Sequence, residues 1–167
     1  MGPRERLIDS TITLIRRRGV HATGLTDLLQ HSGTARQSIY QHFPGGKAEL
    51  VEQATLEAGR QMAARLSGAD PVVLVDTLID WWEHVLNTTS FASGCPVVSA
   101  ALASSPSAGT VFQSWETQLT AVLSDRSLAS FVISAVEGAV IQSRARQSTR
   151  PLDDARVQLT RLLSLSH

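Results

Sequence analysis

Five polar side chains that could contact a nucleic acid lie within positions 36–42 of the sequence. They are Arg36, Gln37, Ser38, Tyr40 and His42. Arginine and glutamine can each form two hydrogen bonds with the edge of a base, so Arg36 and Gln37 are the best candidates for reading a DNA sequence. The hydroxyl groups of Ser38 and Tyr40 are better suited to positioning the segment on the phosphate backbone. This combination of side chains predicts contacts in the major groove of DNA.

Two short helices must position these side chains, and the sequence predicts both. Apolar residues recur at helical spacing in each helix: Leu25, Leu28 and Leu29 in the first, and Ala35, Ile39 and Phe43 in the second. Gly33 lies between them, where the first helix ends and the chain reverses. Two helices joined by a short turn that contains Gly form a helix-turn-helix motif. The spacing alone is also compatible with an ordinary helical hairpin whose polar face meets solvent.

The composition is that of a folded, globular chain. Of the 167 residues, 43% are hydrophobic and 18% are charged, and the formal net charge is zero. Residues 1–48 carry a net charge of +4 and the remainder −4, which suggests a polyanionic partner for the first part only. The single Cys95 cannot form an intramolecular disulfide and fits a reducing compartment. We expect a cytoplasmic protein without a membrane span, bound metal or cofactor.

Helical patterns account for most of the chain, and no alternation typical of strands competes with them. The expected helices cover residues 4–18, 47–66, 70–86, 97–103, 110–124, 127–147 and 151–165, in addition to the two short ones. This pattern predicts an all-α fold: three helices at 1–46, which include the helix-turn-helix, and a helical body at 47–167. The helix at 47–66 would connect the two domains.

Lys47 follows Pro44-Gly45-Gly46 and lies in the first turn of the connecting helix. A cation there opposes the helix dipole, so its position suggests that it serves a partner. A DNA phosphate near that helix N-terminus would satisfy both the lysine and the free backbone N–H groups. We therefore add Lys47 to the predicted DNA-binding residues.

The aromatic side chains of the second domain suggest a pocket for a small apolar molecule. The candidate ligand-binding residues are Met62, Trp81, Trp82, Phe91, Cys95, Phe112 and Trp115. Adjacent tryptophans at 81 and 82 point about 100° apart on a helix, so they cannot both fill one narrow stripe. Packing of the same rings in a core is the alternative. Cys95 is a candidate reactive thiol, although a small buried residue is the simpler interpretation.

Residues 4–54 resemble the DNA-binding part of TetR-family transcriptional repressors. The resemblance includes the opening Arg-Glu-Arg-Leu-Ile-Asp, Arg-Gly at 18–19, and the run from Gly33 to Phe43 that closes on Ile-Tyr-Gln-His-Phe-Pro. Ala35 replaces the usual Ser or Thr cap, and Gln37 stands where glycine is common. Thr26 replaces a frequent arginine and implies a weaker contact from the first helix of the motif. Pro-Gly-Gly-Lys at 44–47 and Gly-Cys-Pro-Val at 94–97 resemble the LmrA/YxaF-like subgroup.

This resemblance implies that residues 1–46 form a DNA-binding domain and residues 47–167 a ligand-binding and dimerisation domain. It also implies a homodimer that binds double-stranded operator DNA and leaves it when a small-molecule inducer enters the second domain. We expect the dimer to form through the helices at 110–124 and 127–147, where Ser134, Ala135, Gly138 and Ala139 allow close approach. These helices could instead pack within one chain. A helical ligand-binding or scaffold protein without DNA binding is the alternative function. No arrangement of residues suggests a catalytic site, so we do not expect an enzyme.

Overall fold

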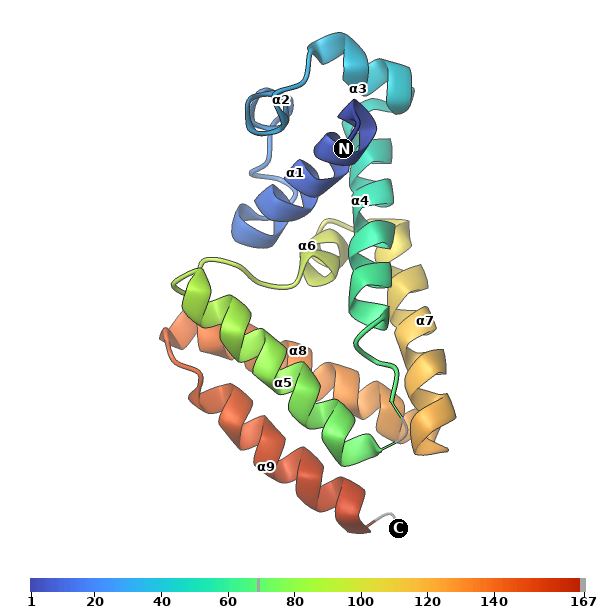
Figure 1. Cartoon of the computed structure of the whole chain (residues 1–167), viewed down its shortest axis with the longest axis vertical. Coiled ribbons are helices and arrows are strands. Elements are labelled where there is room, and N and C mark those ends of the chain that lie inside the picture. The colour runs from blue at the N-terminus through green and yellow to red at the C-terminus, as the bar shows by residue number, and fades with distance from the viewer. Residues whose placement is uncertain (69, 166–167) are drawn as a thin grey trace. The chain divides into compact units, whose positions relative to one another are not determined.

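The computed structural model describes residues 1–68 and 70–165, and within them the chain forms nine α-helices joined by turns (Figure 1). The prediction of an all-helical fold is confirmed. The helices are α1 (Pro3–Arg18), α2 (Leu25–Ser32), α3 (Arg36–His42), α4 (Gly46–Ala63), α5 (Pro71–Thr88), α6 (Pro96–Leu102), α7 (Pro106–Leu123), α8 (Arg126–Arg146) and α9 (Arg150–Leu165). None of the described helices is long and apolar enough to cross a membrane.

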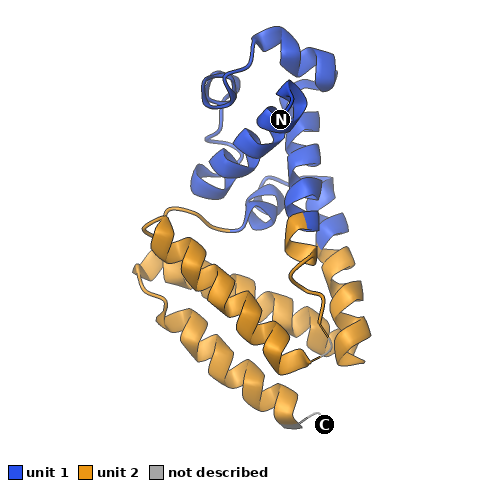
Figure 2. Cartoon of the chain, viewed as in Figure 1, with its two compact units in different colours: residues 1–60, 95–111 blue, residues 61–94, 112–167 orange. Residues whose placement is uncertain are grey.

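The chain divides into two compact units, each built from two separate stretches of sequence (Figure 2). Unit 1 comprises Met1–Arg60 and Cys95–Val111, and unit 2 comprises Gln61–Gly94 and Phe112–His167. Helices α4 and α7 therefore each contribute residues to both units. The predicted domains, 1–46 and 47–167, concern function rather than compactness, and that division stays a prediction.

Unit 1 packs around α1, which contacts α2, α3 and α6. Its fully buried side chains include Leu7, Ile15, Leu28, Ile39 and Phe43. Gly33, with a φ of 62°, ends α2 in the left-handed conformation that glycine adopts most readily. Asp27 strengthens the start of the same helix, because its carboxylate accepts a hydrogen bond of 2.9 Å from the backbone N–H of Gly24.

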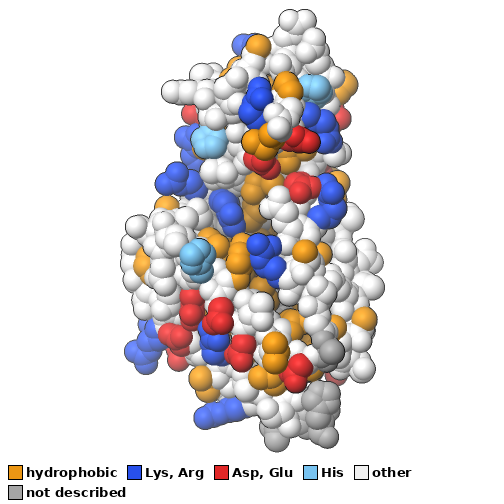
Figure 3. All heavy atoms as spheres, in the orientation of Figure 1, with side chains coloured by type: hydrophobic (Ala, Val, Ile, Leu, Met, Phe, Trp, Pro, Cys, Tyr) orange, Lys and Arg blue, Asp and Glu red, His pale blue; other side chains and the backbone are white. Residues whose placement is uncertain are grey.

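Unit 2 packs α9 against α5 and α8. The carboxylate of Asp70 caps α5 by accepting hydrogen bonds from the N–H groups of Val72 and Val73 at 2.8 and 3.0 Å. Arg156 of α9 pairs with Asp76, Asp80 and Glu83 of α5. Figure 3 shows acidic and basic side chains gathered on this part of the unit 2 surface.

Three helix boundaries differ from the sequence prediction by two residues or more. Helix α4 ends at Ala63 rather than Leu66, because the backbone N–H groups of Arg65 and Leu66 bond three residues back in a turn. Helix α5 runs to Thr88, two residues beyond the predicted end. Helix α7 begins at Pro106 rather than Thr110. Residues 106–109, which precede the helix predicted at 110–124, thus form the first turn of α7.

The early start of α7 has a physical cause in another helix. The Glu52 carboxylate on α4 accepts a hydrogen bond of 2.7 Å from the Ser105 hydroxyl and one of 2.9 Å from the Ser107 N–H. It thereby satisfies a backbone N–H group in the first turn of α7, in addition to the local start that Ser105 and Pro106 provide. Burial favours a higher pKa for Glu52, but these hydrogen bonds outweigh it and lower the pKa below its ordinary value.

Candidate DNA-binding and ligand-binding sites

The candidate DNA-binding surface is the outward face of α3. Ile39 is the only buried residue of this seven-residue helix, and it anchors α3 in the core of unit 1. Arg36, Gln37, Tyr40 and His42 are exposed, whereas Ser38 is half-buried. A single anchor leaves most of the helix surface available to a partner. The structure therefore places the five predicted side chains on one short helix and exposes four of them.

The connections on both sides of α3 fix its position. The hydroxyl groups of Ser32 and Thr34 lie 2.7 Å apart within the turn before α3. Ala35 occupies the N-cap position without a side-chain hydrogen bond, as the sequence indicated. After the helix, Gly46 has a φ of 68°, and a Cβ atom there would lie 3.5 Å from the Tyr40 ring. Tyr40 thus has one edge against the backbone while half of its surface stays exposed.

The two other predicted DNA-binding residues lie outside α3. Thr26 is exposed in the first turn of α2. Lys47 is half-buried in the first turn of α4, and its Nζ donates a hydrogen bond of 3.0 Å to the backbone carbonyl of Val20. An ammonium group has three donors, so this bond leaves further donors for a phosphate. Lys47 therefore has an intramolecular role in addition to its predicted one.

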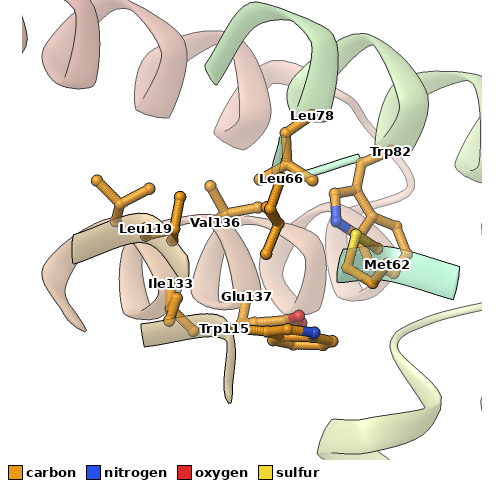
Figure 4. A pocket seen from close by; sticks show the side chains of 10 residues that line it. Met62, Leu66, Leu78, Trp82, Trp115, Leu119, Ile133, Val136 and Glu137 are labelled. Carbon is orange, nitrogen blue, oxygen red and sulfur yellow. The ribbon is translucent and has the colours of Figure 1, made fainter. Parts of the chain in front are cut away.

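A cavity in unit 2 is the candidate ligand-binding site (Figure 4). Its lining comes from four helices and the turn after α4: Met62, Leu66, Leu78, Trp82, Trp115, Leu119, Val132, Ile133, Val136 and Glu137. The free volume is only about 20 Å³, which is close to the space that one water molecule occupies. Pockets that enclose drug-sized ligands usually reach several hundred Å³. A ligand would therefore have to enlarge this cavity.

An open groove between α7 and α8 adjoins the cavity. It is lined by Phe112, Gln113, Glu116, Ser130, Ile133, Ser134 and Glu137, and its volume is about 400 Å³. Ile133 and Glu137 line both spaces, so they separate the groove from the cavity. The groove has the volume that the cavity lacks.

The structure brings together some of the predicted ligand-binding residues. Met62, Trp82 and Trp115 line the cavity, and Phe112 lines the groove, where its ring meets the ring of Trp115 edge-on at 5.5 Å. The other three predicted residues line neither space. The guanidinium carbon of Arg65 lies 4.6 Å from the centre of the Trp81 ring, and the backbone carbonyl of Phe91 accepts a hydrogen bond from Arg144. Cys95 is buried and immediately precedes α6 in unit 1.

The sequence analysis missed Glu137, although a signal was present. It is the only charged residue between Arg126 and Arg144, and it interrupts an otherwise uncharged stretch. The cavity's remaining aliphatic residues carry no comparable signal, because lining and core positions have the same composition. Among the residues that the structure describes, no cluster of His, Cys, Asp or Glu could hold a metal ion.

The helix-turn-helix, the all-helical body and comparisons with known proteins agree on the class of protein. Residues 7–54 match the model of bacterial regulatory proteins of the TetR family. Residues 71–158 match the C-terminal domain of LmrA/YxaF-like transcriptional regulators. This chain belongs to the TetR family of DNA-binding transcriptional regulators, which is not a family of enzymes. Within that family it has an LmrA/YxaF-like C-terminal domain, as the sequence suggested.

Individual proteins support this assignment. An uncharacterized HTH-type transcriptional regulator of Mycobacterium tuberculosis is 38% identical over 97% of this chain and 94% of its own length. The regulator YxaF of Bacillus subtilis is 27% identical over 89% of this chain and 88% of its own length. A regulatory protein TetR of Rhodobacter sphaeroides has the same fold, with a TM-score of 0.84 at 16% identity; the match covers 94% of this chain and 96% of that one.

Proposed function

We propose that this regulator is a homodimeric repressor that a small, largely apolar molecule releases from its operator. The observation that carries the proposal is the face of α3, where one buried residue anchors a helix with four exposed polar side chains. The cavity and groove of unit 2 provide a separate place for a ligand. Release requires that the ligand bind more tightly to a conformation that does not fit the operator.

Each predicted DNA-binding residue has a defined role in this proposal. Arg36 and Gln37 read base edges in the major groove, because both side chains are exposed and can form paired hydrogen bonds. Ser38, Tyr40 and His42 position α3 on the duplex. Two contacts lie outside α3: Lys47 binds a phosphate with its remaining donors, and Thr26 adds a weaker contact from α2.

We place the dimer interface on α8 and α9. Large apolar side chains are exposed on both helices: Phe131 and Ile141 at 53%, Val157 at 47% and Leu162 at 38%. A Cβ atom at Gly138 would meet nothing within 4 Å, so another helix could approach closely there. Helix α7, which the sequence also suggested, has no exposed large hydrophobic residue in its described length. Ala139 is buried and packs within its own chain.

The test of DNA binding begins with selection of tight-binding duplexes from a random pool, because the operator sequence has to be found first. The expected operator is a palindrome with half-sites about 34 Å apart, or a multiple of that, because a twofold dimer presents two α3 helices. Fluorescence anisotropy over a range of salt concentrations should show the linear decrease in log affinity that phosphate contacts produce. Absence of any salt-dependent duplex binding would favour a ligand-binding or scaffold protein instead.

A reporter-gene assay tests whether the protein represses transcription. A reporter gene placed behind the selected operator should be silent when the protein is present and active when α3 carries Arg36→Ala. A reporter that is active only with the wild-type protein would identify an activator. Analytical ultracentrifugation should show a dimer, and Gly138→Trp should convert it into a monomer. An unchanged dimer for Gly138→Trp would contradict the proposed interface.

A further inference from the structure

An open groove in unit 1, which we call the unit 1 groove, is a second place for a small molecule. It lies between Val20, the first two turns of α4 and residues 103–106, all of which belong to unit 1 (Figure 2). Its volume is about 280 Å³, close to the lower limit of about 300 Å³ that is usual for small-molecule sites. The groove therefore has room for a small ligand, and it shares no lining residue with the cavity and groove of unit 2.

Two side chains of opposite charge line the unit 1 groove, and both come from α4. The Nζ atom of Lys47 donates a hydrogen bond of 3.0 Å to the backbone carbonyl of Val20, which holds Lys47 at one wall. The Glu52 carboxylate accepts a hydrogen bond of 2.7 Å from the Ser105 hydroxyl, which holds it at the wall formed by residues 103–106. The two charges are therefore fixed at different walls of the groove.

The α4 surface between these two charges is apolar. Successive residues of a helix are turned by about 100°, so the lining residues of α4 follow one another around the helix in the order Lys47, Val51, Ala48 and Glu52. Lys47 and Glu52 are separated by about 140° around the helix and by about 7.5 Å along its axis. A ligand that reaches both charges therefore has to place an apolar middle part over Val51 and Ala48.

Neither Lys47 nor Glu52 forms an ion pair within the part of the chain that the structure describes. Lys47 uses one of its three N–H donors on Val20, so two donors are available. Burial raises and hydrogen bonds lower the pKa of Glu52, and the hydrogen bonds prevail, so its carboxylate is charged at neutral pH. A ligand with a single charge would be attracted by one of these groups and repelled by the other. A zwitterion with separated charges would be attracted by both.

We propose that the unit 1 groove binds a small zwitterion whose carboxylate and ammonium groups lie at opposite ends of an apolar chain. The carboxylate pairs with Lys47, the ammonium group pairs with Glu52, and the apolar chain covers Val51 and Ala48. This site is additional to the ligand site of unit 2. It does not depend on the repressor function, because its lining residues and its test involve neither α3 nor DNA.

The single lysine of the chain gives a direct readout at this groove. When only lysine Cε carries carbon-13, the NMR spectrum of the full-length protein contains one lysine signal, which comes from Lys47. The dependence of its chemical shift on ligand concentration gives the dissociation constant. Binding that calorimetry detects without any change in the Lys47 signal would place the ligand elsewhere and overturn the proposal.

Four small molecules test the charge pattern on the wild-type protein. 6-Aminohexanoate carries its two charges at the ends of an apolar chain, whereas its isomer norleucine carries both on the same carbon. Hexanoate and hexylammonium each carry one charge. 6-Aminohexanoate should bind at least about threefold more tightly than each of the other three, because it alone can pair with both Lys47 and Glu52. No binding of 6-aminohexanoate at tens of millimolar, or equal affinity of any of the other three, would overturn the proposal.

Two matched carboxamide variants of α4 test the position of the ammonium group. Glu52→Gln should weaken 6-aminohexanoate binding at least about threefold and leave hexanoate affinity unchanged or increased, because hexanoate pairs with Lys47 alone. Glu49→Gln is the control, because Glu49 does not line the groove and its carboxylate instead accepts a hydrogen bond of 2.7 Å from the Gly45 N–H. It should change 6-aminohexanoate affinity less than about twofold. Similar losses in both variants, or unchanged 6-aminohexanoate affinity in Glu52→Gln, would contradict the proposal.

Discussion

The two units present their functional side chains in opposite ways. In unit 1, α3 buries Ile39 alone and directs its charged and polar side chains outward. In unit 2, apolar side chains from α4, α5, α7 and α8 converge on a small cavity. The first arrangement depends on seven consecutive residues, whereas the second depends on long-range packing. Substitutions on the face of α3 should therefore change function without changing stability, and substitutions around the cavity should change both.

The largest predicted loss of stability is for a substitution at Phe43, which follows α3 and packs in the core of unit 1. The ring of Phe43 is fully buried in unit 1, so Phe43→Ala should lower the free energy of unfolding by about 3–5 kcal/mol. Leu102→Ala is the control, because Leu102 is 80% exposed in the same unit and should cost less than about 0.5 kcal/mol. Urea denaturation measures both, and equal losses would contradict the buried position of Phe43.

The next effect separates DNA contact from stability. Arg36→Ala should weaken operator binding by about 1–3 kcal/mol, through loss of paired hydrogen bonds to a base, and should leave the free energy of unfolding nearly unchanged. Arg150→Ala is the matched control, because Arg150 is exposed on α9 of unit 2. Anisotropy measures affinity and thermal denaturation measures stability. If both variants bound the operator equally well, α3 would not be the reading helix.

A smaller effect is expected at the cap of α7. Glu52→Gln should lower the free energy of unfolding by about 1 kcal/mol at neutral pH, because the charged cap is lost. The pKa of Glu52 is lowered in the folded protein, so this stabilisation is complete above the unfolded pKa of about 4.3 and is lost as the pH falls through the lower folded pKa.

Urea denaturation at several pH values should therefore show wild type and Glu52→Gln converging below about pH 4. Asp154→Asn, which removes one partner of an exposed pair on α9, should cost less than about 0.5 kcal/mol. A constant difference between wild type and Glu52→Gln at every pH would exclude the charge as the source of the cap's strength.

The smallest effect tests the two roles of Lys47, which is the only lysine in the chain. Lys47→Ala should reduce the slope of log affinity against log salt by about one unit and weaken all DNA sequences similarly. Loss of its hydrogen bond to Val20 should also cost about 0.5–1 kcal/mol of stability. Lys47→Arg keeps the charge and should keep the slope. Loss of stability without a change in slope would leave Lys47 only its intramolecular role.

The sequence predicted unit 1 better than the cavity for a physical reason. The cap, turn and apolar spacing of α2 and α3 are local, and the helix bounds follow from Gly24, Gly33 and the stripe that ends at Phe43. Ser105 and Pro106 are a local signal for the start of α7, but the contribution of Glu52 is not local, because its carboxylate lies 55 residues before the Ser107 N–H that it binds.

The cavity shows the same limit. Aromatic composition suggested Trp82 and Trp115, which line it, but equally suggested Trp81 and Phe91, which do not. Whether a ring faces a cavity depends on how helices distant in sequence pack, and periodicity within one helix does not contain that information. Glu137 was detectable as an isolated charge in an uncharged stretch, although its neighbours in space were not.

Unit 1 is built from two separate stretches of sequence, and this affects both its synthesis on the ribosome and its transfer into other proteins by gene fusion. Helix α6 contacts α1, and Ser105 and Ser107 bind Glu52, yet a ribosome adds these partners only after residues 61–94. The first 60 residues therefore emerge without part of their packing, and unit 1 is completed late in synthesis. A gene fusion that transfers only residues 1–60 to another regulator would separate α1 and Glu52 from these partners. A fusion that keeps the packing of unit 1 therefore has to include residues 95–111 as well.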